Sequence, residues 1–343
     1  MFSGVRAAET VDVADPVLRS PTDVILSVER TAICGSDLHP YRGEWGDPGG
    51  QRPGHEFIGT IVEAGRDVRS RRRGERVLCS GAVGCGECPA CAQGLSAACV
   101  SGMKVFGIPM MTDYPGGQAE YVAVPSADFS LLPIPEEVAP EAALLLTDNL
   151  ATGWQAAQRA GVREGNSAVV VGFGPVGMCA AMSARELGAW DLFVIDPLGS
   201  RREFAASLGY RAFDATPEAE AEIVELTGGG ADCVLETAGR DASMRSAVAV
   251  AHPSATISSV SVPSEPYSAE PSERRLPTQR FRSSVASPQR AWPQLIPRLG
   301  SPALARLAEI FSHRLPLARS AEAYALFSER PDECRKILFD LTL

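Results

Sequence analysis

The chain has 343 residues, of which 45% are hydrophobic and 22% charged, and its formal net charge is −10. This length exceeds what one hydrophobic core usually supports, so two domains are expected. The negative charge gives no general drive toward nucleic acid. The sequence also lacks a signal-peptide core after Met1 and any stretch of about 20 apolar residues. These features predict a cytoplasmic protein with no nucleic-acid or membrane partner.

Short β-like segments separated by Gly- and Pro-rich turns dominate the first part of the chain, at 24–28, 57–63 and 119–124. They predict a small, irregular β domain. From Ala168 onward, apolar strands alternate with helix-like stretches, and this alternation predicts a parallel sheet with crossover helices. The expected strands are 168–171, 192–195, 233–235 and 256–260.

The remaining segments are less regular. The densest basic run, residues 69–76, is interpreted as a solvated loop. Residues 253–297 are rich in Pro, Ser and Arg, and a loop is predicted there because proline interrupts regular elements. Helical patterns follow at 303–311 and 321–327, and a strand-like segment lies at 336–341.

Four of the nine cysteines lie close together beside Gly and Pro: Cys85, Cys88, Cys91 and Cys99. Without an export signal, this density favours metal ligation over disulfides. A bacterial iron–sulfur motif has three residues before its last Cys and a Pro after it, whereas here seven residues intervene and Val100 follows. Four thiolates at this spacing predict a closed tetrahedral zinc site, which is structural because no coordination position stays open.

Possible ligands of a second metal lie upstream of the four cysteines. Cys34 opens the segment Cys34-Gly35-Ser36-Asp37-Leu38-His39, and His55 and Glu56 follow about twenty positions later. A catalytic zinc needs three protein ligands and one exchangeable position. Taken alone, Cys34 could equally be a small core residue, and His55 could satisfy a local hydrogen bond. The residues by themselves leave these alternatives open.

A glycine-rich motif follows the apolar run 169–171: Gly172-Phe173-Gly174-Pro175-Val176-Gly177. The helix-like stretch 178–187 comes next, and this strand–turn–helix context makes a dinucleotide site the favoured interpretation. The glycines allow a tight turn and close approach of the backbone to a pyrophosphate at the helix N-terminus. Asp196, at the end of the next strand, suits the ribose hydroxyls and favours NAD(H) over NADP(H). Arg201 and Arg202 nearby leave NADP(H) open, because they could accommodate a 2′-phosphate.

Together, these motifs resemble, in order and spacing, the zinc-containing alcohol dehydrogenases of the medium-chain dehydrogenase/reductase superfamily. The resemblance implies an α/β fold, with a GroES-like β domain and a Rossmann domain built on a doubly wound parallel sheet. Residues 1–149 would form the catalytic domain with both zinc sites. Residues 150–286 would form the dinucleotide-binding domain, and residues 287–343 would return to the first. Similar proteins are homodimers or homotetramers.

The resemblance also assigns roles to individual residues. It implies Cys34, His55 and Asp148 as ligands of the catalytic zinc, with Glu56 beside the metal as a further, transient ligand. Asp37 would accept a hydrogen bond from the ring of His55. Ser36 and His39 would relay the proton, because a hydroxyl and an imidazole add no fixed negative charge and imidazole exchanges protons near neutral pH. Arg201 joins the glycines, Pro175, Val176 and Asp196 in the cofactor site.

The implied activity is reversible oxidation of an alcohol to an aldehyde or ketone, with two Zn²⁺ ions and NAD(H). Two alternatives remain open: reduction of an imine or conjugated carbonyl compound, and a non-catalytic zinc- and nucleotide-binding redox sensor. His252-Pro253 and Ser261 stand where relatives usually have glycines around the strand at 256–260. These departures bear on substrate range and turnover more than on fold or metal binding.

Overall fold

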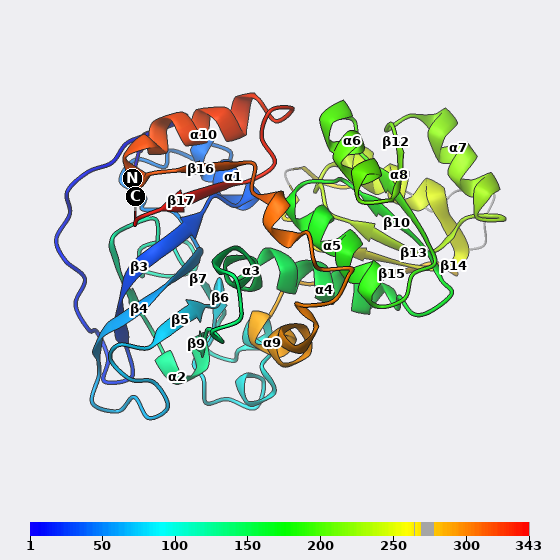
Figure 1. Ribbon diagram of the computed structural model, residues 1–343. Coiled ribbons are helices and arrows are strands. Elements are labelled where there is room, and N and C mark those ends of the chain that lie inside the picture. The colour runs from blue at the N-terminus through cyan, green and yellow to red at the C-terminus, as the bar shows by residue number, and fades with distance from the viewer. Residues whose placement is uncertain (264, 269–277, 343) are drawn as a thin grey trace. The chain divides into compact units, whose positions relative to one another are not determined.

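The computed structural model describes residues 1–263, 265–268 and 278–342 (Figure 1). Within this range the chain forms two compact units. The first contains Met1–Ala151, Ala286–Leu299 and the C-terminal segment from Leu307 onward. The second contains Thr152–Val285 and Gly300–Arg306, so a short piece of the segment predicted to return to the first domain lies in the second unit. No helix among the described residues is long and apolar enough to cross a membrane.

A seven-stranded sheet is the centre of the first unit, with strand order β16-β17-β3-β4-β5-β9 and β8 paired to β3. The strands are β3 (Val24–Ala32), β4 (Glu56–Ala64), β5 (Arg76–Cys79), β8 (Tyr121–Val124), β9 (Leu131–Pro133), β16 (His313–Leu315) and β17 (Ile337–Asp340). Alternate apolar residues of β3, such as Val24 and Leu26, are fully buried and pack with Phe57 and Val77. Burial of these apolar side chains therefore holds this β domain together.

β17 connects the end of the chain with its beginning. It pairs antiparallel with β3, with Leu338 opposite Ala32, and β3 in turn pairs antiparallel with β4, with Ala32 opposite Glu56. Helix α10 (Ser320–Glu329), which was predicted at 321–327, precedes β17 and packs Tyr324 and Phe327 into a second core. The C-terminal segment is therefore an integral part of the first unit (Figure 1).

The second unit contains a six-stranded parallel sheet of strand order β12-β11-β10-β13-β14-β15. Its strands are β10 (Ser167–Val171), β11 (Asp191–Ile195), β12 (Arg211–Phe213), β13 (Ala231–Glu236), β14 (Ala251–Ser259) and β15 (Arg280–Ser283). The helices between them are α5 (Pro175–Glu186), α6 (Gly199–Ser207), α7 (Pro217–Leu226) and α8 (Asp241–Val250). Numbered along the chain, this order is 3-2-1-4-5-6, the doubly wound Rossmann arrangement. The predicted fold class is confirmed.

The loop predicted over residues 253–297 is wrong in two places. β15 adds a parallel strand beside β14, and α9 (Pro288–Leu295) is a helix in spite of its prolines. Pro288 occupies the first helical turn, where no backbone donor is needed, and Trp292 is buried with its indole N–H bonded to the Leu146 carbonyl at 2.9 Å. Burial thus outweighs the cost of Pro293 within the helix. Residues 264 and 269–277 of this range lie outside the described residues.

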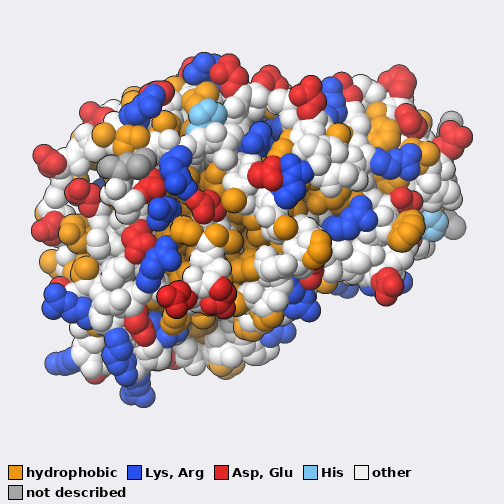
Figure 2. Space-filling view, in the orientation of Figure 1, with side chains coloured by type: hydrophobic (Ala, Val, Ile, Leu, Met, Phe, Trp, Pro, Cys, Tyr) orange, Lys and Arg blue, Asp and Glu red, His pale blue; other side chains and the backbone are white. Residues whose placement is uncertain are grey.

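The helix predicted at 303–311 is also wrong, because this segment forms turns and the short 3₁₀ helix η5 (Leu307–Ile310). Its buried residues Leu304, Leu307 and Ile310 recur every three positions, a spacing that suits a 3₁₀ turn. Elsewhere, residues 69–75 of the basic run lie in the connection between β4 and β5, and Arg76 begins β5. On the face drawn in Figure 2, acidic and basic side chains of the described residues are interspersed.

Candidate metal centres and dinucleotide site

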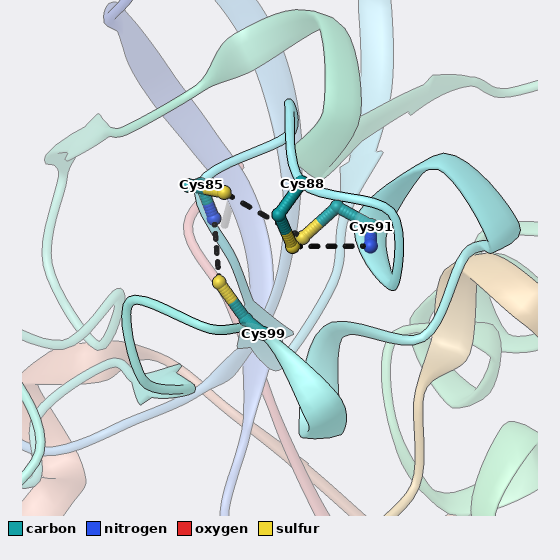
Figure 3. A group of neighbouring side chains, drawn as sticks. All are labelled: Cys85, Cys88, Cys91 and Cys99. Atoms are coloured by element: carbon teal, nitrogen blue, oxygen red, sulfur yellow. Dashed lines mark hydrogen bonds between the residues drawn. The ribbon is translucent and has the colours of Figure 1, made fainter.

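The four predicted zinc cysteines lie together in the loop that follows β6 (Ala82–Val83). Their sulfurs lie within 4.8 Å of one another, and all four side chains point toward a common centre (Figure 3). The Cys85 and Cys91 sulfurs are 4.0 Å apart. Because zinc–sulfur bonds of about 2.3 Å give a tetrahedron with edges of roughly 3.8 Å, this group fits a zinc ion without rearrangement of the chain.

The backbone of the loop favours thiolates at this position. Hydrogen bonds from the backbone N–H groups of Cys91 and Val100 lower the pKa of Cys88 to about 6, whereas burial raises the pKa of Cys91 to about 12. Gly84 is required sterically, because a Cβ atom there would lie 2.6 Å from the Cys91 sulfur. The loop can therefore surround the sulfurs closely only with glycine at this position.

Helix α9 fastens this loop to the rest of the first unit. Gln289 donates from Nε2 to the Ala82 carbonyl at 3.1 Å and accepts from the Ser96 hydroxyl at 3.0 Å. Ser287 accepts from the Ala97 N–H at 3.1 Å. The α9 segment, which the sequence assigned to a loop, is thus a structural support of the cysteine group.

Replacing one of these cysteines tests the structural role. We expect Cys88→Ala to lose one metal ion per chain and to destabilise the protein by roughly 2–5 kcal/mol, a melting-temperature decrease on the order of 5–15 °C. Cys79→Ala is the matched control, because Cys79 is fully buried in β5 and belongs to neither ligand group. Metal analysis of both variants measures the number of ions per chain, and thermal melting measures the loss of stability. Equal melting temperatures for the two would contradict it.

A second group of possible ligands consists of Cys34, His55, Glu56 and Asp148, with ligand atoms within 4.8 Å of one another. Cys34 follows the end of β3, and His55 precedes β4, so the pairing of these strands brings the two side chains together. Asp148 lies in the turn between α3 (Pro140–Leu146) and α4 (Asn149–Ala160). The structure therefore unites residues separated by more than a hundred positions.

The distances within this group suit a tetrahedral ion. Asp148 Oδ2 lies 3.5 Å from Cys34 Sγ and 3.5 Å from His55 Nε2. Zinc bonds of about 2.0–2.3 Å give tetrahedral edges of roughly 3.3–3.8 Å. One sulfur, one imidazole nitrogen and one carboxylate oxygen are thus arranged as three corners, which leaves a fourth corner for another ligand.

Asp37 lies close to His55. Its Oδ1 is 3.4 Å from His55 Nδ1, and its Oδ2 accepts the backbone N–H of Cys34 at 3.0 Å. Burial disfavours an imidazolium here, but Asp37 and Cys34 raise the pKa of His55 well above its ordinary value. Gln118 adds a donor to Asp37 Oδ2 at 3.4 Å and accepts from the Tyr324 hydroxyl at 2.9 Å.

Glu56 has partners that the sequence analysis missed. Its fully buried carboxylate forms an ion pair with the fully buried Lys336, with Nζ at 2.7 Å from Oε2 and 3.0 Å from Oε1. Asn149 donates to Glu56 Oε1 at 2.9 Å and to Asp148 Oδ2 at 3.1 Å. Burial would lower the pKa of Lys336, but Glu56 and Cys34 raise it above its usual value. The only signal in the sequence was a lysine at the head of an apolar, strand-like segment.

The two predicted relay residues contact different partners. Ser36 Oγ lies 3.4 Å from His55 Nε2, beside the group of possible ligands. His39 is on α1 (Leu38–Tyr41), where its Nδ1 lies 2.5 Å from Glu44 Oε2 and its ring stacks on Trp45 with centroids 5.0 Å apart. Glu44 is a second residue that the sequence analysis did not identify.

The glycine motif joins β10 to α5 in the second unit. Gly172 has a φ of +89°, which few other residues adopt, and a Cβ atom at Gly177 would lie 2.0 Å from the Gly172 carbonyl. Gly174 is the N-cap of α5, and Pro175 and Val176 form its first turn. The backbone donors of this helix end are thus available to an anion.

Asp196 lies at the end of β11, beside the glycine turn. Its carboxylate is almost completely buried and accepts the N–H groups of Phe173 at 2.6 Å and Leu198 at 2.9 Å. Arg201 Nη1 lies 3.5 Å from the same carboxylate. Arg202 instead contacts Asp214 at 3.1 Å. The structure therefore brings together the predicted glycines, Asp196 and Arg201.

Ser261 and His252, which stand where relatives usually have glycines, form local hydrogen bonds in the second unit. Ser261 donates to Glu236 Oε2 at 2.7 Å, at the end of β13. Glu236 is fully buried and also accepts from Ser259 at 2.9 Å. His252 Nδ1 lies 2.8 Å from the Ser254 hydroxyl. Ser261 is thus held by a buried carboxylate, which a glycine could not contact in this way.

Comparison with known proteins agrees with this fold. Residues 20–136 match the alcohol dehydrogenase GroES-like domain, and residues 175–301 match the zinc-binding dehydrogenase family. A probable zinc-binding alcohol dehydrogenase of Mycobacterium tuberculosis is 42% identical over 320 residues, which is 93% of this chain and 82% of that protein. The chain therefore belongs to the zinc-binding alcohol dehydrogenases of the medium-chain dehydrogenase/reductase superfamily, and it is an oxidoreductase.

Solved structures of alcohol dehydrogenases have the same fold. The alcohol dehydrogenase of Thermus sp. ATN1 is 30% identical, with a TM-score of 0.89 over 99% of this chain and 98% of that chain. A zinc-dependent alcohol dehydrogenase of Streptococcus pneumonia is 29% identical, with a TM-score of 0.90 over 100% of this chain and 97% of that chain.

Proposed function

We propose that this oxidoreductase oxidises an alcohol, or reduces the matching aldehyde or ketone, with zinc as the catalytic metal and NAD(H) as hydride carrier. The main support is the group formed by Cys34, His55 and Asp148, whose ligand atoms are spaced like three corners of a zinc tetrahedron. A thiolate, a carboxylate and a neutral imidazole would balance the two charges of Zn²⁺. When bound there, zinc would polarise the oxygen of an alcohol or carbonyl compound.

The neighbouring side chains have separate tasks in this proposal. Ser36 would accept the proton of the substrate hydroxyl, since its own hydroxyl can both accept and donate. His39 would release that proton to solvent, which its side chain reaches with an exposed fraction of 14%. Asp37 orients His55, and Lys336 with Asn149 holds the Glu56 carboxylate at one position. Cys85, Cys88, Cys91 and Cys99 would hold a second, structural zinc.

A metal and turnover assay tests the proposal. We expect two zinc ions per chain, and NAD reduction with at least one member of a panel of primary alcohols, polyols and hydroxymethyl compounds. Turnover only with imines or conjugated carbonyl compounds would mean that the substrate belongs to one of these classes and is not an alcohol. Two zinc ions without turnover of any of these compounds would favour a non-catalytic protein.

The preference for NAD(H) is supported by the position of Asp196, whose carboxylate would accept ribose hydroxyls and repel a 2′-phosphate. We expect Asp196→Ala to lower the ratio of kcat/KM for NAD to that for NADP by roughly 10- to 100-fold, because charge-assisted hydrogen bonds to the ribose are lost. Asp214→Ala is the control, because Asp214 contacts Arg202 and is about half exposed. A wild-type enzyme that prefers NADP would overturn the assignment of NAD(H) and favour binding of the 2′-phosphate by Arg201 and Arg202.

A further inference from the structure

His39 and Glu44 form a pair that is fixed by the backbone as well as by the side chains. The N–H of Glu44 donates to the carbonyl of His39 at 2.9 Å, which closes a turn after α1. Gly43, with a φ of +75°, permits this turn. His39 Nδ1 then lies 2.5 Å from Glu44 Oε2, and the Trp45 ring lies nearly parallel to the imidazole, at 8°. The position of His39 is therefore set by its own loop.

The contact has a definite consequence for the imidazole protons. An ionised carboxylate can only accept hydrogen bonds, so the nitrogen beside it must carry a proton. Neutral His39 is therefore protonated at Nδ1, and its Nε2 retains a lone pair. Without such a partner, a neutral imidazole can place its proton on either nitrogen, and a ring protonated at Nε2 cannot accept a proton there.

We propose that Glu44 is a positioning residue that keeps His39 in the Nδ1-protonated form, so that Nε2 is the proton acceptor of the relay. The inference rests on the relay role proposed for His39. During alcohol oxidation Nε2 takes up the proton that Ser36 accepted from the substrate hydroxyl, while Nδ1 keeps its hydrogen bond to the Glu44 carboxylate. Nε2 then releases the same proton to water, which restores the starting form. Stacking on Trp45 restricts rotation of the His39 ring, so the orientation of Nε2 stays fixed.

Two substitutions separate this role from a purely structural one. Glu44→Leu removes the acceptor, whereas Glu44→Gln keeps a carbonyl oxygen that can accept the Nδ1 proton. Glu44 is partly exposed, with a side-chain exposure of 30%, so neither change is expected to affect folding. The chain has four histidines, so ¹⁵N NMR of the zinc-loaded enzyme labelled at histidine can resolve the tautomer of His39.

The wild type and Glu44→Gln should show the Nδ1-protonated form, and Glu44→Leu should shift His39 toward Nε2 protonation. In the same variants, kcat for alcohol oxidation should fall on the order of 10-fold in Glu44→Leu with little change in KM, and Glu44→Gln should restore most of it. An unchanged tautomer in Glu44→Leu would overturn the inference, as would unchanged turnover.

His39→Gln distinguishes failure of the inference from failure of the proposed function. If His39→Gln loses turnover while Glu44→Leu does not, the relay stands and the role of Glu44 is wrong. If His39→Gln turns over alcohol at the wild-type rate, His39 is not in the relay and the inference falls with it. The alcohol dehydrogenase activity itself would still stand in that case.

Discussion

Cys34→Ala is expected to abolish alcohol turnover while the protein stays folded. Loss of the thiolate removes one corner of the proposed zinc tetrahedron, so metal analysis should find one zinc per chain instead of two. Several kcal/mol of transition-state stabilisation would be lost with the metal, which corresponds to a decrease in kcat/KM of roughly 10³-fold or more. Truncation of one buried sulfur creates only a small cavity and should cost about 1 kcal/mol of unfolding free energy.

The contrast with two other cysteines makes this expectation specific. Cys79→Ala removes another buried sulfur, that of β5, and should retain both zinc ions and full activity. Cys88→Ala should lose stability rather than only activity. Wild-type turnover in Cys34→Ala would refute the catalytic metal site, and unfolding of Cys34→Ala would refute the separation between a catalytic and a structural zinc.

Lys336→Met should be the most destabilising single change at this site. Lys336 and Glu56 are both fully buried, and methionine would leave the Glu56 carboxylate without its cation. Removal of one partner of a buried ion pair typically costs about 3–5 kcal/mol. Urea denaturation monitored by circular dichroism, with zinc content determined in parallel, measures this loss.

Matched variants identify the cause of the destabilisation. Arg76→Met breaks the partly exposed pair of Arg76 with Glu29, at 2.7 Å, and should cost at most about 1 kcal/mol. Glu56→Gln combined with Lys336→Met should recover part of the loss, because no buried charge then remains unpaired. If Lys336→Met were no more harmful than Arg76→Met, the ion pair would not be a determinant of stability.

Local sequence determined the parts of this protein whose chemistry depends on close neighbours in the chain. The cysteine spacing defines a metal loop because four sulfurs within fifteen residues can surround one ion, with Gly84 leaving room for them. The glycine motif defines the turn before α5 because its backbone conformation excludes larger residues. The parallel sheet followed from apolar strands that alternate with helices. Asp148, in contrast, was assigned as a ligand only from the resemblance to known dehydrogenases.

Only the tertiary structure showed the partners that come from distant segments. Lys336 reaches Glu56 because β17 pairs with β3 and β3 pairs with β4, and no local pattern encodes that register. Burial of Trp292 made a helix of a proline-rich segment that looked like a loop. Glu44 is only five positions from His39 in the sequence, but its contact with the imidazole was recognised only from the turn that brings the two side chains together. Backbone preferences depend on neighbouring residues and can be predicted from the sequence, whereas contacts between distant side chains depend on how the whole chain packs.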